Sequence, residues 1–224
     1  MIRNSLKLTF VGSILALTSA VNASPTPWDL PAGSQPTFNF SGGQTDSGKL
    51  GSSIATGSGF FFTPVNFVAL SNTPSSVSSD TISVILNAKP NQMFTSISSS
   101  ILGDFSMFGV ASASATGSLK ITNLDTASIL TSPLSFNNLP AATATSADGG
   151  WDGATALALP AGWTNIKVEM ESSLLAEGSQ GLSLIQAKDG EIGVNTAEIP
   201  LPAAALVVPV LAVIGWRARK KLAR

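Results

Sequence analysis

Alternation of apolar and polar side chains is the feature that most constrains the fold of this chain. In Ile166-Lys-Val-Glu-Met-Glu171 the apolar residues fall on one face and the charged residues on the other, as in a half-buried strand. The runs 37–41, 81–88 and 93–101 alternate in the same way or form short apolar stretches between turn residues. No convincing amphipathic helix occurs between residues 24 and 198. Many short strands of this kind predict an all-β domain, either a β-sandwich or a jelly roll.

Glycines and Asp-Gly pairs indicate where we expect these strands to end. Gly103-Asp104 and Gly117 predict breaks between strands, and the segment from Ser146 to Gly153 predicts a loop. Residues 177–181 predict a turn. Lys188-Asp-Gly-Glu191 carries the Asp-Gly signature of a tight hairpin.

Charge divides the chain into an acidic middle and two basic ends. All thirteen acidic residues lie between Asp29 and Glu198, a region that contains only five lysines. This region therefore has a net charge of −8 and no basic patch. Such a surface repels phosphate backbones, so nucleic acid is excluded as a partner.

The sequence contains no cysteine and no histidine. Disulfides and thiolate sites are therefore impossible, and the usual base of a serine triad and the commonest zinc ligand are missing. We expect no enzyme activity, no metal and no cofactor. The apolar core must stabilise the domain alone, and a chain of this length can bury enough surface to do so.

The first 23 residues have the pattern of a signal peptide. Arg3 and Lys7 form a basic region, and the mostly apolar residues 8–16 follow it. Small or modest residues precede the expected cleavage site, so we expect signal peptidase to cut after Ala23 and leave Ser24 as the first residue. The apolar core is too short to span a membrane comfortably, which argues against an uncut anchor.

An apolar run near the C-terminus predicts a membrane span. From Ala203 to Gly215 there is no charged or strongly polar side chain. The roughly 18 residues from Ile199 to Trp216 would give a helix of about 27 Å, just short of a hydrocarbon core of about 30 Å. We place the transmembrane segment at about 201–216. Pro200 and Pro202 disfavour a helix that runs through them, so we expect the helix itself to begin after them. By the positive-inside rule we expect the basic residues that follow to be cytoplasmic: Arg217, Arg219, Lys220, Lys221 and Arg224.

The C-terminal segment 199–224 resembles a known sorting signal. Its motif Ile199-Pro200-Leu201-Pro202-Ala203, apolar segment and basic end are similar to the VPLPA-CTERM signal, a variant of the PEP-CTERM signal in proteins that exosortases of Gram-negative bacteria handle. Two departures are Ile199 in place of Val and Pro209 inside the span. The resemblance implies an exosortase-type sorting protease as a partner. A looser similarity of segments in the middle region to other PEP-CTERM-tailed proteins implies a shared β domain and no activity.

These features predict three regions: a signal peptide (1–23), an exported β-sandwich domain (24–198) and a sorting signal (motif 199–203, span about 201–216, basic tail 217–224). We expect a non-catalytic protein of the cell envelope or extracellular matrix. It would be anchored in the inner membrane before processing and lie at the cell surface or outside afterwards. The expected partners are signal peptidase, the sorting protease, the membrane and exopolysaccharide. A carbohydrate- or calcium-binding surface module, or a periplasmic domain whose tail is never cut, remain as alternatives.

Three residues are candidates for ligand binding. Asp148 and Asp152 flank Trp151, and a carboxylate pair beside an aromatic ring is what a glycosidase site or a calcium-assisted sugar site would use. Asp-Gly segments are also common turns, so an ordinary structural explanation stays open. Glu169 and Glu171 share the polar face of one strand, which we interpret as a solvated edge.

Overall fold

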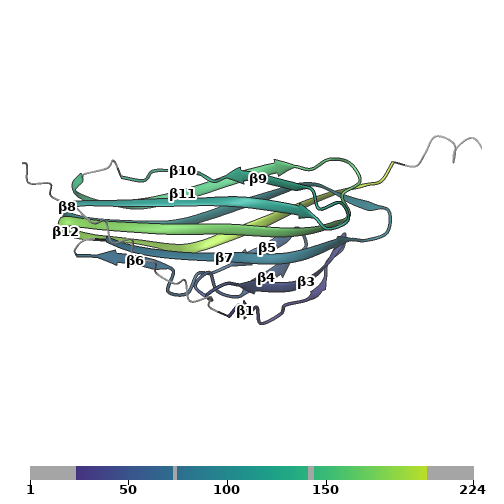
Figure 1. The fold of residues 1–224 in the computed structure, drawn as a ribbon, viewed down its shortest axis with the longest axis horizontal. Coiled ribbons are helices and arrows are strands. Elements are labelled where there is room, and N and C mark those ends of the chain that lie inside the picture. The colour runs from purple at the N-terminus through teal and green to yellow at the C-terminus, as the bar shows by residue number, and fades with distance from the viewer. Residues whose placement is uncertain (1–23, 73–74, 141–143, 201–224) are drawn as a thin grey trace, which may run out of the picture.

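The computed structural model describes residues 24–72, 75–140 and 144–200 (Figure 1). All regular secondary structure in these ranges is β-strand, and they contain no helix that is long and apolar enough to cross a membrane. The strands are β1 (Thr26–Pro27), β2 (Gly33–Ser34), β3 (Phe38–Thr45), β4 (Ser53–Thr56), β5 (Gly59–Phe62), β6 (Val68–Ser71), β7 (Ser75–Ala88), β8 (Gln92–Asn123), β9 (Ile129–Pro133), β10 (Ser135–Asn137), β11 (Ala144–Ala158) and β12 (Asn165–Glu198).

The strands belong to one antiparallel sheet, which confirms the all-β prediction. Its main order is β1-β3-β7-β12-β8-β11-β10. The short strands extend this path: β2 pairs with β3, β4 with β5, β5 and β6 with β12, and β9 with β8. The C-terminal strand β12 is therefore a central strand and contacts more strands than any other does.

The two longest strands, β8 and β12, fold back along their length. Ser99 of β8 is the register partner of Ile192 of β12, yet its hydroxyl donates a hydrogen bond of 2.8 Å to the sulfur of Met170. On a straight strand, residues 170 and 192 would lie about 70 Å apart at about 3.3 Å per residue. The sheet must therefore double over, so that its buried faces meet.

Close backbone contacts locate the bend. Ser183 pairs with Met107, but its hydroxyl donates to the carbonyl of Ser112 at 2.6 Å, so β8 turns between these two residues. Gly109 lies between them with φ +75°, a backbone region that favours glycine. A Cβ on Gly109 would lie 2.7 Å from the carbonyl oxygen of Gln180. Glycine is thus required where the sheet folds.

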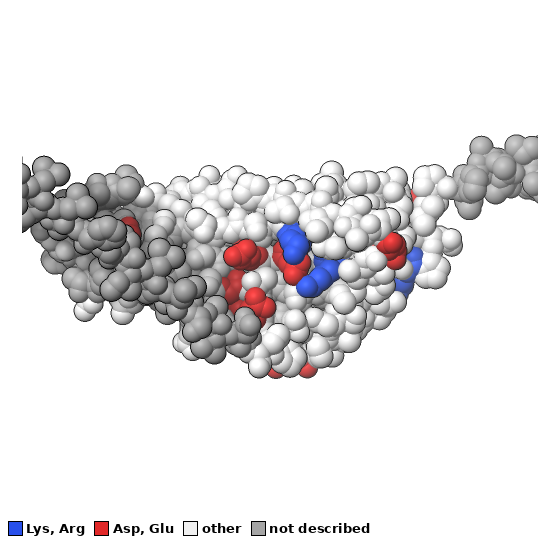
Figure 2. Space-filling view, viewed as in Figure 1, with Lys and Arg blue, Asp and Glu red and all other residues white. Residues whose placement is uncertain are grey.

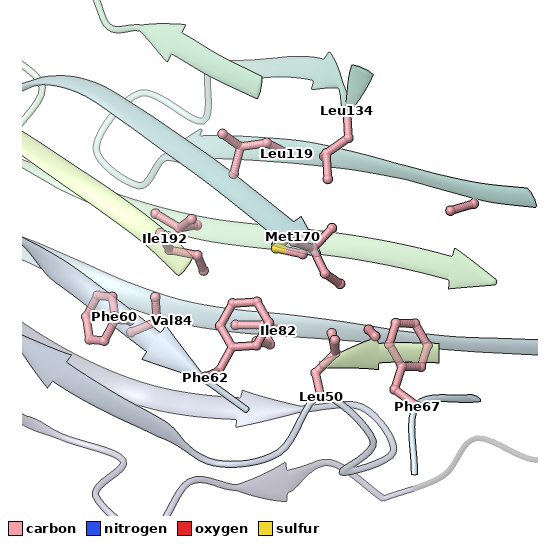
Figure 3. Packing of buried hydrophobic residues seen from close by; sticks show 14 of the residues in the cluster. Leu50, Phe60, Phe62, Phe67, Ile82, Val84, Leu119, Leu134, Met170 and Ile192 are labelled. Carbon is pink, nitrogen blue, oxygen red and sulfur yellow. The ribbon is translucent and has the colours of Figure 1, made fainter. Parts of the chain in front are cut away.

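Aromatic side chains fill the space between the facing parts of the sheet. Phe38 of β3 lies 6.1 Å from Phe60 of β5 and 6.3 Å from Phe94 of β8, measured between ring centroids, although β3 pairs with neither strand. Phe40 meets Phe60 edge to face at 5.1 Å. Figure 3 shows Phe60 in the same buried cluster as Met170 of β12. Such aromatic pairs contribute about 0.5–1.5 kcal/mol each beyond their area burial.

Two register shifts in β12 lie where turns were predicted. The shift between Gly178 and Gln180 lies where residues 177–181 were expected to turn, and the shift between Ala187 and Asp189 lies at the expected Asp-Gly hairpin. The hairpin prediction is wrong, because β8 continues as the partner of β12 across that shift. At 177–181 the pairing also continues, but the sheet folds over here, so the chain changes direction at the predicted turn without ending the strand. Each shift changes which alternate residues of β12 face the core, as β-bulges do.

Three other predicted interruptions also lie inside strands. The segment 146–153, expected as a loop, belongs to β11, and Gly103-Asp104 and Gly117 belong to β8. A Cβ on Gly103 would lie 2.7 Å from the indole ring of Trp151, and one on Gly117 would lie 2.6 Å from a carbonyl oxygen of β12. These glycines permit close approach between strands and do not end them.

Candidate functional site

The described chain ends at Pro200, inside the segment 199–203 that was predicted to be a sorting motif. The last register pair of β12 joins Glu198 to Gln92, and the backbone N–H of Ile199 donates to the carbonyl of Asn91 at 2.9 Å. Ile199 and Pro200 are exposed. The first residue of the motif is thus still tied to the sheet. Leu201, Pro202, Ala203, the basic residues 217–224 and Ala23 lie outside the described residues, whereas Ser24 is described and exposed.

The ligand candidates Asp148, Trp151 and Asp152 lie on β11 but not on one face. Trp151 is buried, lies 5.9 Å from Phe136 of β10, and donates from its indole nitrogen to the carbonyl of Asp104 at 3.2 Å. The two aspartates lie on the opposite, outer face, four positions apart along the strand and therefore separated by about 13 Å. The ring is not available to stack on a sugar beside these carboxylates.

Asp152 has local partners of its own. Its carboxylate accepts hydrogen bonds from the side-chain amides of Asn137 at 3.0 Å and Asn138 at 3.2 Å. Asn138 has φ +59° and immediately follows β10. These contacts attach the end of β10 to β11, so Asp152 has a structural role.

A second cluster, which the sequence did not indicate, lies on the outer face of β3, β7, β12 and β8. Sheet register places Gln44, Ser83, Glu169 and Lys120 in one row across these four strands. Neighbouring rows bring further polar side chains around a hollow of about 240 Å³. We call this the charged hollow; Figure 2 shows acidic and basic groups gathered on this side of the molecule. Its lining residues are Gln44, Asp46, Thr81, Ser83, Ser118, Lys120, Lys167, Glu169 and Glu171.

Glu169 is the electrostatic centre of the charged hollow. Lys120 Nζ lies 2.7 Å from its Oε2 and Lys167 Nζ lies 2.8 Å from its Oε1. Burial by itself would raise the pKa of Glu169, but the hydrogen bonds and charges of the two lysines outweigh it and lower the pKa below the ordinary value of 4.5. Glu169 therefore stays ionised at neutral pH. Glu169 and Glu171 lie on the central strand β12, so their interpretation as an edge is wrong.

The charged hollow presents hydrogen-bond donors and acceptors side by side. Two ammonium groups, three carboxylates, one amide and several hydroxyls line it. Within the described ranges, no group of three or more carboxylates is placed to hold a metal ion. The arrangement suits recognition of a polyhydroxylated or zwitterionic group. It has no aromatic platform.

Sequence comparison adds no relative to this geometry. No protein-family model matches the chain, and a search of curated proteins found no match. The resemblance of the C-terminal motif therefore stands on the residues that carry it.

Proposed function

We propose that this chain is an exported, non-catalytic protein of the cell envelope or extracellular matrix that an exosortase-type protease sorts through residues 199–224. One observation carries the proposal: β12 stays paired up to Glu198, and among the described residues the N–H of Ile199 is the last backbone donor bound to the domain. The last described strand thus ends where the motif begins. A sorting signal must be separable from its cargo, and this boundary supports that division.

The proposed domain is of the β-sandwich class. The doubling of β8 and β12 and the aromatic contacts between unpaired strands support two packed layers made from one continuous sheet. In such an arrangement, alternate residues of each strand face the core and the remainder face water. The serines and threonines of β8 and β12 then form much of the outer surface.

A non-catalytic role is supported by the chemistry available. The sequence lacks histidine and cysteine. The aspartates that suggested a carbohydrate-active site lie apart from the buried Trp151, and Glu169 is held by two lysines. A structural or adhesive protein needs no more than the stable fold and the polar outer faces that are present.

Intact mass measurement tests the proposal. The protein is isolated from its native host and from a strain without the sorting protease. We expect a species that begins near Ser24 in both strains and that loses the basic tail only when the protease is present. A species that keeps Arg224 in both strains would overturn the sorting proposal and leave a plainly anchored periplasmic domain.

A paired substitution sharpens this test. Pro200→Ala with Pro202→Ala alters the motif, so we expect the uncut form to accumulate. The matched control is Pro160→Ala, which changes an exposed proline in a turn of the domain and should leave processing unchanged. Equal processing of both variants would mean that the protease does not read the proline motif.

A second candidate function is binding of exopolysaccharide, favoured by the charged hollow. Its mixed donors and acceptors suit sugar hydroxyls and acidic sugars, and the lysines are within reach of an added anion. We expect Lys120→Gln with Lys167→Gln to weaken retention on host exopolysaccharide, whereas Lys188→Gln, outside the hollow, should not. Equal retention of both variants and the unmodified protein would exclude the hollow as the binding site.

A further inference from the structure

Four chain turns gather at the end of the molecule where β12 stops. Figure 1 shows the yellow end of β12 at one tip of the elongated fold. Backbone hydrogen bonds of 2.8 to 2.9 Å connect the turns to neighbouring elements, for example from Lys89 N–H to Thr37 and from Leu124 N–H to Asn165. We call this tip the turn end; it comprises residues 35–37, 89–91, 124–128 and 159–164 together with the end of β12 at Glu198–Pro200.

The turn end is nearly uncharged and partly apolar. Its charged residues are Lys89, Asp125 and Glu198, so eleven of the thirteen acidic residues lie elsewhere. Leu124 and Ile199 each leave 42% of their surface exposed. Prolines and alanines of the turns are exposed as well. This tip can approach an anionic surface with little repulsion, in contrast to the acidic remainder of the domain.

The sequence leaves at most a short spacer between the turn end and the proposed membrane span. Ile199 is bound to Asn91, and the apolar run begins at Leu201, directly after Pro200. A helix from Leu201 to Trp216 would be about 24 Å long, already shorter than a hydrocarbon core of about 30 Å. A helix that begins after Pro202 would be shorter still and would leave Pro200 to Pro202 as the spacer, about 10 Å long if extended at about 3.3 Å per residue.

We propose that, while the tail is uncut, the turn end lies on the lipid headgroup layer and the long axis of the domain points away from the membrane. This inference rests on the proposed function, because it requires the tail to be held in a bilayer. It adds an interaction surface, made by the exposed turns, and its partner, the phospholipid headgroups. The bend of β8 and β12 is then at the far tip: the strand from Asn165 to Glu177 alone covers about 40 Å at about 3.3 Å per residue.

Site-specific fluorescence quenching tests this orientation. The sequence contains no cysteine, so a thiol-reactive dye labels only the single cysteine that is introduced. Ala161→Cys labels an exposed position in the turn end, and Ser179→Cys labels an exposed position at the far tip. The full chain, from cells that lack the sorting protease, is reconstituted in phosphatidylethanolamine–phosphatidylglycerol vesicles that contain a headgroup spin-labelled lipid as quencher.

We expect the protein to float with the vesicles, which shows that it is bound to the membrane. In this bound protein we expect strong quenching of the dye at position 161 and little quenching at position 179. If the chain floats but both positions are quenched equally, the orientation is wrong while the membrane-held tail survives. If the chain does not float, the proposed membrane-held tail itself fails. Release of the dye-labelled domain by proteolysis near residue 200 should abolish quenching at position 161. Quenching that persists would show that the domain binds lipid without the membrane-held tail, and would contradict the proposal that the tail holds the turn end at the membrane.

Discussion

Replacing Asp80 by asparagine should loosen the connection between β3 and β4. Asp80 lies on β7 with 4% of its surface exposed. Its Oδ1 accepts from the backbone N–H groups of Ser47 at 2.8 Å and Thr81 at 2.9 Å, and its Oδ2 accepts from that of Leu50 at 2.8 Å. A single buried carboxylate thus orders the segment 46–50. A charged side chain is rarely buried unless hydrogen bonds or an opposite charge compensate for its loss of water.

The cost of Asp80→Asn follows from those three bonds. An asparagine oxygen can keep the two bonds to Oδ1, but its NH₂ group then faces the N–H of Leu50, donor against donor. A hydrogen bond to a charged group contributes about 1.5–3 kcal/mol and a neutral one about 0.5–1.5 kcal/mol. Losing one bond and weakening two, offset by no longer burying a charge, gives a loss of about 3 kcal/mol in the free energy of unfolding.

Urea unfolding measures this loss. Trp28, Trp151 and Trp163 are buried, so their fluorescence reports the transition of the processed domain. Asp148→Asn is the matched control, because that aspartate is exposed on β11, and it should change stability by no more than about 0.5 kcal/mol. If Asp80→Asn also stays within about 0.5 kcal/mol of the unmodified protein, the carboxylate does not order the segment and the reasoning is refuted.

Three further perturbations probe the charged hollow, the bend and the core. The two lysines lower the pKa of Glu169, so the ion pairs of Glu169 stabilise the fold above about pH 4.5 and lose this effect as the pH falls through the lowered pKa. Glu169→Gln should lower the free energy of unfolding by less than about 1 kcal/mol at pH 7. In unfolding measured over a pH series, the difference between Glu169→Gln and the unmodified protein should vanish in acid. Gly109→Ala should destabilise by about 1–3 kcal/mol because of its positive φ, whereas Gly57→Ala, with open space around the added methyl group, should be near neutral in the same assay. Phe38→Ala should cost about 3–5 kcal/mol, against about 0.5 kcal/mol or less for Phe108→Ala, whose side chain is 74% exposed; equal thermal or urea shifts within either pair would contradict the assigned role.

Local alternation was sufficient to predict strands but not their continuity. The pattern at 166–171 and the apolar run at 81–88 both lie in strands. Successive side chains of a strand point to opposite faces, so a few consecutive residues are enough to show which face is buried. Gly103 and Gly117 were interpreted as breaks because glycine often ends a strand. Glycine inside a strand can instead permit the close approach of a neighbouring backbone. Only the partner backbone decides between the two, and here β12 lies within reach of both. The sequence contains no local signal for that partner.

One geometric rule explains where both sets of site residues lie. Asp148, Trp151 and Asp152 are close in sequence, which suggested a common site, but a strand sends adjacent side chains to opposite faces and buries the tryptophan. Lys120 and Glu169 are far apart in sequence and meet only through the register of β8 and β12. The pair Lys167 and Glu169, two residues apart on one strand, was the only part of the charged hollow that alternation could have indicated.

The position of β12 connects the fold to the proposed sorting step. Its residues 166–177 are paired on both sides, with β7 and β8, and residues 190–193 are paired with β5 and β8. Beyond Gly193 only β8 remains as a register partner, so residues 194–198 are held mainly from one side. A protease that needs extended backbone around Pro200 can therefore draw on these few residues without opening the central strand. Separating the tail from the domain then costs the last few pairs of β12 and leaves the folded core intact, which is what release of an intact surface protein requires.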